Sequence, residues 1–188
     1  MKIENTMNKA LTLISAILIG AAATGWAEVK FVKPGVITTI GQSSDIAVVK
    51  ALLNNKLKLG LDVKPTAQAA DLDGVKTMVV VLGASTKGLG AAGINLDQEK
   101  ERAKALMKAA KEKSVQVLAL HVGGESRRGK TTDDLIELCI CDSKQVVVVA
   151  SGNKDKFFDK QAEKCNVPVS EVANLAAAGD TVKTLFAE

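Results

Sequence analysis

Residues 77–113, TMVVVLGASTKGLGAAGINLDQEKERAKALMKAAKEK, join a strand, a glycine-rich loop and a helix in one stretch. Residues 77–82 contain no polar side chain after Thr77, which is typical of a strand covered by helices on both faces. Residues 96–113 carry apolar side chains at helical spacing, and Asn95 with Gln98 forms a capping-box pattern at their start. This stretch therefore predicts a buried parallel strand that leads through a loop into an amphipathic helix.

The same order of strand, loop and helix recurs along the chain. We expect strands at 36–40, 61–66, 77–82, 115–122 and 146–150, and a last strand or extended segment starting at 167–169. We expect helices after residue 45, at 96–113, at 131–141, from residue 154 to near Asn166 and at 172–186. Strands that alternate with helices form a mostly parallel sheet with right-handed crossovers.

The predicted fold class is α/β, with a single doubly wound, mostly parallel sheet and helices on both faces. The weak second strand and the fully apolar third strand favour a flavodoxin-like strand order of 2-1-3-4-5 in a three-layer sandwich. The sequence shows no internal repeat and no long linker, so we expect one α/β domain over residues 28–188.

Residues 1–27 have the three parts of a secretory signal peptide. Lys2 and Lys9 give a weakly positive start, residues 10–23 are uncharged and mostly apolar, and Gly25-Trp26-Ala27 places small residues before a cleavage site. We expect cleavage after Ala27 and export to the periplasm or outside the cell, with an uncleaved N-terminal anchor as the alternative. Contact with a membrane is expected only through this segment.

The composition limits the classes of partner. Hydrophobic residues make up 47% of the 188 residues and charged residues 24%, which is typical of a globular protein. The net charge of +4 is mild, so we expect no binding of nucleic acid. The sequence holds no Tyr, four Phe and one Trp, which is Trp26. A flavin, sugar or nucleobase would find almost no aromatic side chain on which to stack, and we expect no cofactor.

The three cysteines are Cys139, Cys141 and Cys165. An odd number in an exported protein leaves at least one cysteine free or in an intermolecular bond. Cys139 and Cys141 are too close in sequence to bridge without strain, and no C-x-x-C or histidine-assisted metal spacing occurs. We interpret the cysteines mainly as small buried apolar residues, with a reactive thiol as the alternative, and expect no metal site.

Ligands of a doubly wound sheet bind beyond the carboxyl ends of its strands. Four loops leave those ends, at 41–45, 83–95, 121–130 and 151–154, and they carry glycine with hydroxyl, amide or basic side chains. Glycines let backbone N–H groups face a ligand, and Arg and Lys favour anions. We therefore predict one anion-binding site formed by Gln42, Ser43, Ser85, Thr86, Lys87, Gly88, Gly90, His121, Gly123, Gly124, Glu125, Arg127, Arg128, Asn153 and Lys154.

Each of these features also has a plainer interpretation. Glycines after strands often only make tight turns, and residues 126–130 can form an ordinary solvated loop. His121 is the only histidine and a candidate general base, but a lone histidine is more often structural. A triad of Ser43 or Ser85 with His121 and Glu125 can be drawn, although no spacing supports it.

The motif GLGAAG at 88–93 has the spacing G-x-G-x-x-G of a dinucleotide-binding loop. Its first glycine comes five residues after Gly83, where the strand ends, and that strand is the third and not the first. The segment GASTKG is not a P-loop, because Lys87 precedes Gly88, and it is not a nucleophile elbow, because Lys87 occupies the last glycine position. We therefore expect no binding of NAD.

Four segments together carry a resemblance to a known family. They are ITTIGQS at 37–43, VVLGASTKGLGAAGINLDQE at 80–99, HVGGESRRG at 121–129 and SGNKDKFF at 151–158. Over residues 34–186 the chain resembles a family of small exported bacterial proteins that is catalogued as a domain of unknown function. The resemblance implies export and a single α/β domain, and it brings no activity, ligand or catalytic residue.

Three functions fit these patterns. The first is a non-catalytic exported domain that binds a small anionic ligand at the carboxyl edge of the sheet and serves a transporter or sensor. The second is a hydrolase or transferase that acts on a carboxylate or phosphate ester, with His121 as general base. The third is an envelope module whose loops contact another protein.

Overall fold

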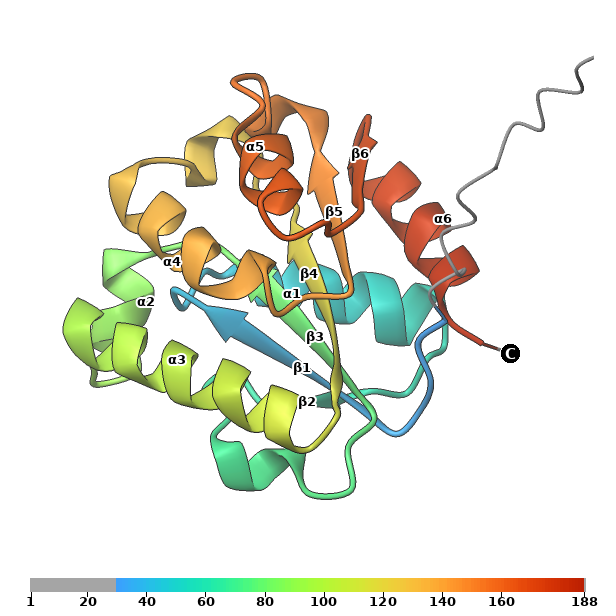
Figure 1. Cartoon of the computed structure of the whole chain (residues 1–188), viewed down its shortest axis with the longest axis horizontal. Coiled ribbons are helices and arrows are strands. Elements are labelled where there is room, and N and C mark those ends of the chain that lie inside the picture. The colour runs from blue at the N-terminus through green and yellow to red at the C-terminus, as the bar shows by residue number, and fades with distance from the viewer. Residues whose placement is uncertain (1–29, 188) are drawn as a thin grey trace, which may run out of the picture.

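The computed structural model describes residues 30–187, in which six strands form one parallel sheet (Figure 1). The strands are β1 (Gly35–Ile40), β2 (Asp62–Val63), β3 (Thr77–Leu82), β4 (Gln116–His121), β5 (Gln145–Val149) and β6 (Val169–Val172). Their order is β2-β1-β3-β4-β5-β6, and every neighbouring pair is parallel. The predicted α/β class and the predicted 2-1-3-4-5 order are confirmed, with β6 added beside β5.

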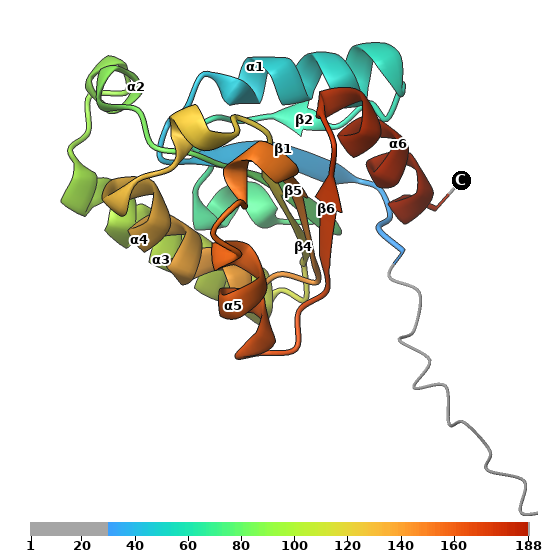
Figure 2. The same ribbon diagram turned by 90° about the horizontal axis from the view of Figure 1, so that it is seen from above.

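Helices cover both faces of the sheet (Figure 2). One face carries α1 (Asp45–Lys50), which continues into a π-helical segment at Ala51–Lys56, and α6 (Leu175–Leu185). The other face carries α3 (Leu96–Glu112), α4 (Lys130–Ile140) and α5 (Phe157–Glu163). Alternate residues of a strand point to opposite faces, so one sheet supplies two hydrophobic cores.

Strand β3 lies at the centre of this arrangement, and all six of its residues are buried. Val79 and Val81 pack with the core beneath α1 and α6, whereas Met78, Val80 and Leu82 pack with the core beneath α3 and α4. An apolar residue at every position is what a strand with two covered faces requires.

Strand β2 is shorter than the predicted range of 61–66. Only Asp62 and Val63 pair with β1, opposite Val36 and Ile37. Pro65 has no N–H to donate to a ladder, and its carbonyl oxygen instead accepts a hydrogen bond from the Thr38 hydroxyl at 3.1 Å. The strand therefore ends before the proline.

The predicted loop 83–95 contains a short helix, α2 (Thr86–Ala91), beyond the carboxyl end of the sheet (Figure 2). The Ser85 hydroxyl accepts a hydrogen bond from the Gly88 backbone N–H at 3.1 Å and caps this helix. A Cβ on Gly88 would lie 1.8 Å from the Gln42 carbonyl oxygen, so this position needs glycine. Glycines have low helix propensity, and for that reason the sequence indicated a loop.

The start of α3 is as predicted. The Asn95 side chain accepts a hydrogen bond from the Gln98 backbone N–H, and the Gln98 side chain accepts one from the Asn95 N–H, both at 2.9 Å. The capping box thus fixes where the glycine-rich segment ends and the long helix begins.

The interpretation of all three cysteines as buried apolar residues is wrong. Cys141 and Cys165 form a disulfide, with their Cα atoms 5.5 Å apart. The disulfide joins the end of α4 to the chain that follows α5. Cys139 alone is free, and it is buried in the core as expected.

The predicted signal peptide, residues 1–27, lies outside the described residues. None of the helices within residues 30–187 has the length and apolar character needed to cross a membrane.

Candidate functional site

The loops that follow β1, β3, β4 and β5 lie at one edge of the sheet, because all these strands are parallel. The Ser85 N–H donates to the Gly41 carbonyl oxygen at 2.8 Å, which joins the loops after β1 and β3. Arg127 reaches Asp45 at 3.4 Å and joins the loop after β4 to the start of α1. The predicted assembly of these loops is therefore present.

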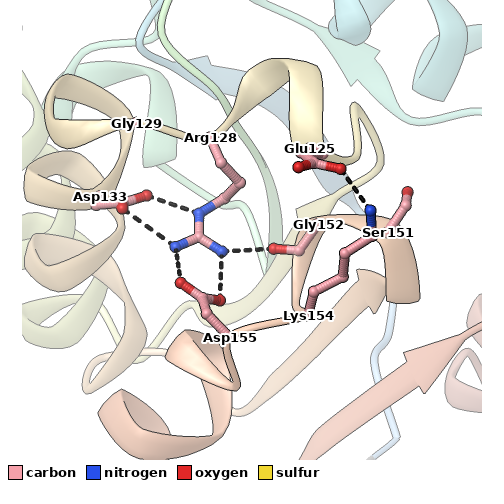
Figure 3. A pocket seen from close by; sticks show the side chains of 8 residues that line it. All are labelled: Glu125, Arg128, Gly129, Asp133, Ser151, Gly152, Lys154 and Asp155. Atoms are coloured by element: carbon pink, nitrogen blue, oxygen red, sulfur yellow. Dashed lines mark hydrogen bonds and ion pairs between the residues drawn. The ribbon is translucent and has the colours of Figure 1, made fainter.

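These loops form two separate pockets instead of the one predicted site. The first has a volume of about 630 Å³ and lies where the strand order reverses between β1 and β3; we call it the switch pocket. It is lined by Thr39, Gln42, Ser43, Ser44, Ile46, Pro65, Ser85, Lys87, Gly88, Ala91 and Arg127. The second, of about 290 Å³, we call the Arg128 pocket. It is lined by Glu125, Arg128, Gly129, Asp133, Ser151, Gly152, Lys154 and Asp155 (Figure 3).

A buried ion pair supports the floor of the switch pocket. The Glu99 carboxylate accepts hydrogen bonds from the Gly41 N–H at 2.7 Å and from the Gln42 side-chain amide at 3.2 Å. Arg102 donates to both oxygens of Glu99 at 2.8 Å, and it also donates to the carbonyl oxygens of Thr39 and Ala67. Gln42 has a left-handed backbone, with φ of 56°, and this network holds it there.

Sequence reasoning missed the roles of Glu99 and Arg102. Both side chains lie on the same face of α3 as the buried residues Ala103, Leu106 and Ala110. A charged pair three residues apart within an apolar stripe indicates burial, and that signal was available in the sequence.

Two cations line the switch pocket. Lys87 is exposed, and no ion pair or hydrogen bond within residues 30–187 engages its ammonium group. Arg127 uses its Nε toward Asp45 at 3.4 Å and its Nη2 toward the Ser44 hydroxyl at 3.1 Å. In the described part of the chain its Nη1 has no acceptor, so this nitrogen can donate to a ligand.

Arg128 is fully engaged within the protein, in contrast to Arg127. Its Nε and Nη2 donate to Asp133, both terminal nitrogens donate to Asp155, and Nη1 also donates to the Gly152 carbonyl oxygen (Figure 3). These contacts use all five N–H donors. The hydrogen bonds to Asp133 raise the pKa of Arg128 further above its ordinary value. The prediction that Arg128 holds an anionic ligand is therefore not supported by its geometry.

The Arg128 pocket is otherwise poor in positive charge. Lys154 donates to Glu125 at 2.5 Å, and this contact holds the pKa of Glu125 below its ordinary value. Three carboxylates, from Glu125, Asp133 and Asp155, oppose two cations in the lining. An added anion would meet net negative charge there.

His121 does not face either pocket. It is fully buried, with Nδ1 at 3.0 Å from the Leu82 carbonyl oxygen and Nε2 at 3.1 Å from the Gly124 carbonyl oxygen. Each ring nitrogen faces a backbone carbonyl oxygen, and the neutral ring can donate to one of the two, so neither nitrogen is open to a substrate. This geometry gives no support to the hypothesis that His121 serves as a general base.

We expect stability to fall between pH 7.5 and pH 5.5 because of His121. Burial lowers the pKa of the imidazole below its ordinary value of 6.5. The unfolded chain then takes up a proton more readily than the folded one. The free energy of unfolding is therefore highest above pH 6.5 and declines as the pH falls below it. Carboxylates titrate at lower pH, and His121 is the only histidine.

Urea unfolding at pH 7.5 and pH 5.5 measures this loss of stability, and the His121→Gln variant should show a smaller difference between the two pH values. An equal difference in the variant contradicts the expectation.

Three other predicted ligand residues make contacts within the protein. Asn153 is buried, and its amide donates to Asp159 at 2.5 Å and to Glu171 at 2.8 Å. A Cβ on Gly123 would lie 2.1 Å from Cγ of Arg127, and a Cβ on Gly124 would lie 2.5 Å from Oγ of Ser151. These two glycines permit close packing of loops.

Two further predicted residues, Gly90 and Thr86, lie at the periphery. Gly90 is exposed on α2, and a Cβ added there would meet no neighbouring atom within 4 Å. Thr86 lines a smaller hollow of about 250 Å³ together with Lys130 and Thr132. Gly88 and Gly90 of the GLGAAG motif lie inside α2, not in a turn between strand and helix.

Residues 30–187 contain no group of three or more His, Cys, Asp or Glu side chains arranged to hold a metal ion.

The comparisons with known proteins identify a family. Among solved structures, the chain matches the psychrotrophic esterase EstA from Pseudoalteromonas sp., in a structure inhibited by monoethylphosphonate, with 10% sequence identity and a TM-score of 0.31. The match covers 80% of this chain and 86% of the esterase chain. This likeness is too weak to bear on activity. A search of curated proteins finds no match. The family model for a domain of unknown function, DUF6305, matches residues 32–186. The chain therefore belongs to the DUF6305 family.

Proposed function

We propose that the protein binds a small anionic ligand in the switch pocket and catalyses no reaction on it. One observation carries this proposal. Among the described residues, the lining of the pocket combines Lys87 and Arg127 with three serine hydroxyls and contains no carboxylate.

The arrangement of Arg127 supports the proposal. Asp45 and the Ser44 hydroxyl hold two of its nitrogens, so the guanidinium is oriented before a ligand arrives. Within residues 30–187 its Nη1 and the ammonium of Lys87 have no protein acceptor, and hydrogen bonds from such charged donors are about twice as strong as neutral ones. Asp45 offsets one of the two positive charges, and a net charge of about +1 remains from these three side chains.

The location at the reversal of strand order is also typical of ligand sites in open α/β sheets. Export through residues 1–27 and service to a transporter or sensor remain part of this proposal. An envelope protein is then the partner to which a loaded domain would deliver its ligand.

Anion titrations with variants test the proposal. Isothermal titration of the purified protein at low ionic strength with acetate and with inorganic phosphate should detect binding of at least one of them. Lys87→Ala and Arg127→Ala should each raise the Kd about tenfold, because each removes a charged hydrogen bond of about 1.5 kcal/mol. Lys154→Ala in the Arg128 pocket is the matched control and should leave the Kd unchanged.

Two results would overturn the proposal. One is an absence of binding by the wild-type protein at tens of millimolar of every anion tested. The other is equal weakening by Lys154→Ala and Lys87→Ala, since that would show a general charge effect with no preference for the switch pocket.

A further inference from the structure

We infer that the ligand of the switch pocket is an aliphatic carboxylate, with its charged end at Arg127 and Lys87 and its hydrocarbon body against the apolar wall. This inference rests on the proposed function and names the chemical class of the ligand. It follows from the apolar wall, from the absence of aromatic side chains among the described lining residues, from the occupation of four backbone N–H groups, and from the net charge of the site.

The wall of the switch pocket is largely carbon. Ile46 comes from α1, Pro65 follows β2, and Ala91 ends α2, so three separate elements supply apolar surface to the same hollow. Ile46 is half-buried and packs against the core, which holds it in place. A purely polar anion such as sulfate would leave this apolar surface exposed to water, whereas a hydrocarbon chain would bury it.

Within residues 30–187, no aromatic side chain lines the switch pocket. The phenylalanines of this part of the chain pair with each other elsewhere, Phe31 with Phe186 at 5.8 Å and Phe157 with Phe158 at 6.0 Å between ring centroids. A nucleobase or another planar ring would have no stacking partner, so the wall suits an aliphatic body.

Four backbone N–H groups of the glycine-rich loops are used within the protein and are not open to a phosphoryl group. The N–H groups of Gly41, Ser85 and Gly88 donate to Glu99, to the Gly41 carbonyl oxygen and to the Ser85 hydroxyl. The Asp45 N–H donates to the Ser43 hydroxyl at 3.1 Å. Phosphate sites in glycine-rich loops depend on several free N–H groups, and these four are occupied.

The remaining donors fit a carboxylate. The charged donors of the switch pocket are the Lys87 ammonium group and Nη1 of Arg127, and serine hydroxyls lie beside them. With Asp45 beside Arg127, the site carries a net charge of about +1, which matches a monoanion better than a phosphate dianion. The chemistry therefore favours a carboxylate of one negative charge on an apolar chain.

A chain-length series tests this inference. Isothermal titrations of the purified protein with acetate, butanoate and hexanoate should give a Kd that falls about fourfold per methylene, since a buried methylene contributes about 0.8 kcal/mol. Hexan-1-ol, which has the same chain and no charge, should bind at least tenfold more weakly than hexanoate. Inorganic phosphate should bind more weakly than hexanoate.

Variants of the wall localise the effect. Ile46→Ala should weaken hexanoate about tenfold and leave acetate unchanged, because only the longer chain reaches the wall. Val48→Ala is the matched control, since Val48 lies on the same helix, is exposed and does not line the pocket. Pro65→Ser is a second wall variant with the same expectation, and it keeps the test decisive if Ile46→Ala fails to fold.

The outcomes separate the inference from the proposed function. If acetate or phosphate binds through Lys87 and Arg127 without any dependence on chain length, the inference fails and the proposed function stands. If no anion binds, both fail. If hexan-1-ol binds as tightly as hexanoate, the pocket recognises no charge, and the proposed function fails with the inference. A dependence on chain length that both wall variants remove and Val48→Ala retains supports the inference.

Discussion

We expect replacement of Glu99 by leucine to lower the free energy of unfolding by about 3 to 5 kcal/mol. Glu99 and Arg102 are both buried, and the substitution leaves the Arg102 guanidinium in the core without its carboxylate. It also removes the acceptor of the Gly41 N–H, which lies at 2.7 Å from Glu99. Urea unfolding followed by circular dichroism measures the loss. Because Glu99 also holds Gln42, anion binding in the switch pocket should weaken as well.

A surface ion pair on the same helix supplies the control. Glu101 pairs with Lys104 at 2.8 Å, and both side chains are largely exposed. Glu101→Gln should change the free energy of unfolding by less than about 0.5 kcal/mol, since exposed pairs contribute little. The double variant Glu99→Leu/Arg102→Leu should recover part of the stability, because no charge is then left buried without a partner. A loss of under about 1 kcal/mol for Glu99→Leu would contradict the role given to this pair.

The second large effect concerns the disulfide. The double variant Cys141→Ser/Cys165→Ser should lose about 3 kcal/mol, because the bond closes a loop between residues 24 apart and restricts the unfolded chain. For a domain of this size, the midpoint of thermal unfolding should fall by about 6 to 12 °C. Differential scanning calorimetry measures the shift.

Reduction provides an independent measurement of the same effect. The wild-type protein in dithiothreitol should unfold near the midpoint of the double variant, and dithiothreitol should leave the variant unchanged. Cys139→Ala retains the disulfide and should keep its sensitivity to dithiothreitol. A wild-type midpoint that dithiothreitol does not move would show that the bond contributes nothing.

The sequence predicted the positions of those elements that neighbouring residues determine. Strand β3 and the capping box of α3 lie where the sequence placed them, because an all-apolar run and a cap are decided by neighbouring residues. The short helix α2 was missed, since its glycines disfavour a helix and contacts with the Gln42 backbone and the Ser85 cap decide its conformation. The disulfide was missed because two helices bring Cys165 to Cys141, which no local pattern shows.

The candidate site was predicted in part for the same reason. Parallel strands bring the four loops to one edge, so their proximity follows from topology alone. Which side chains keep free hydrogen-bond donors does not follow from topology. Arg127 and Arg128 are adjacent in sequence and alike in chemistry. In the part of the chain that the structure describes, Arg127 keeps one nitrogen without an acceptor, whereas Arg128 uses all its donors. Only the three-dimensional positions of Asp133 and Asp155 separate them.

The contrast between Arg127 and Arg128 bears on the rate at which a ligand would associate. Arg128 joins the loop after β4 to α4 and to the chain after β5. Arg127, the residue before it, lines the switch pocket. A ligand that meets Arg127 therefore meets backbone that was ordered during folding, at about 1–2 kcal/mol per residue. If the switch pocket binds an anion as proposed, we expect capture without closure of this loop and an association rate constant of about 10⁵–10⁷ M⁻¹s⁻¹.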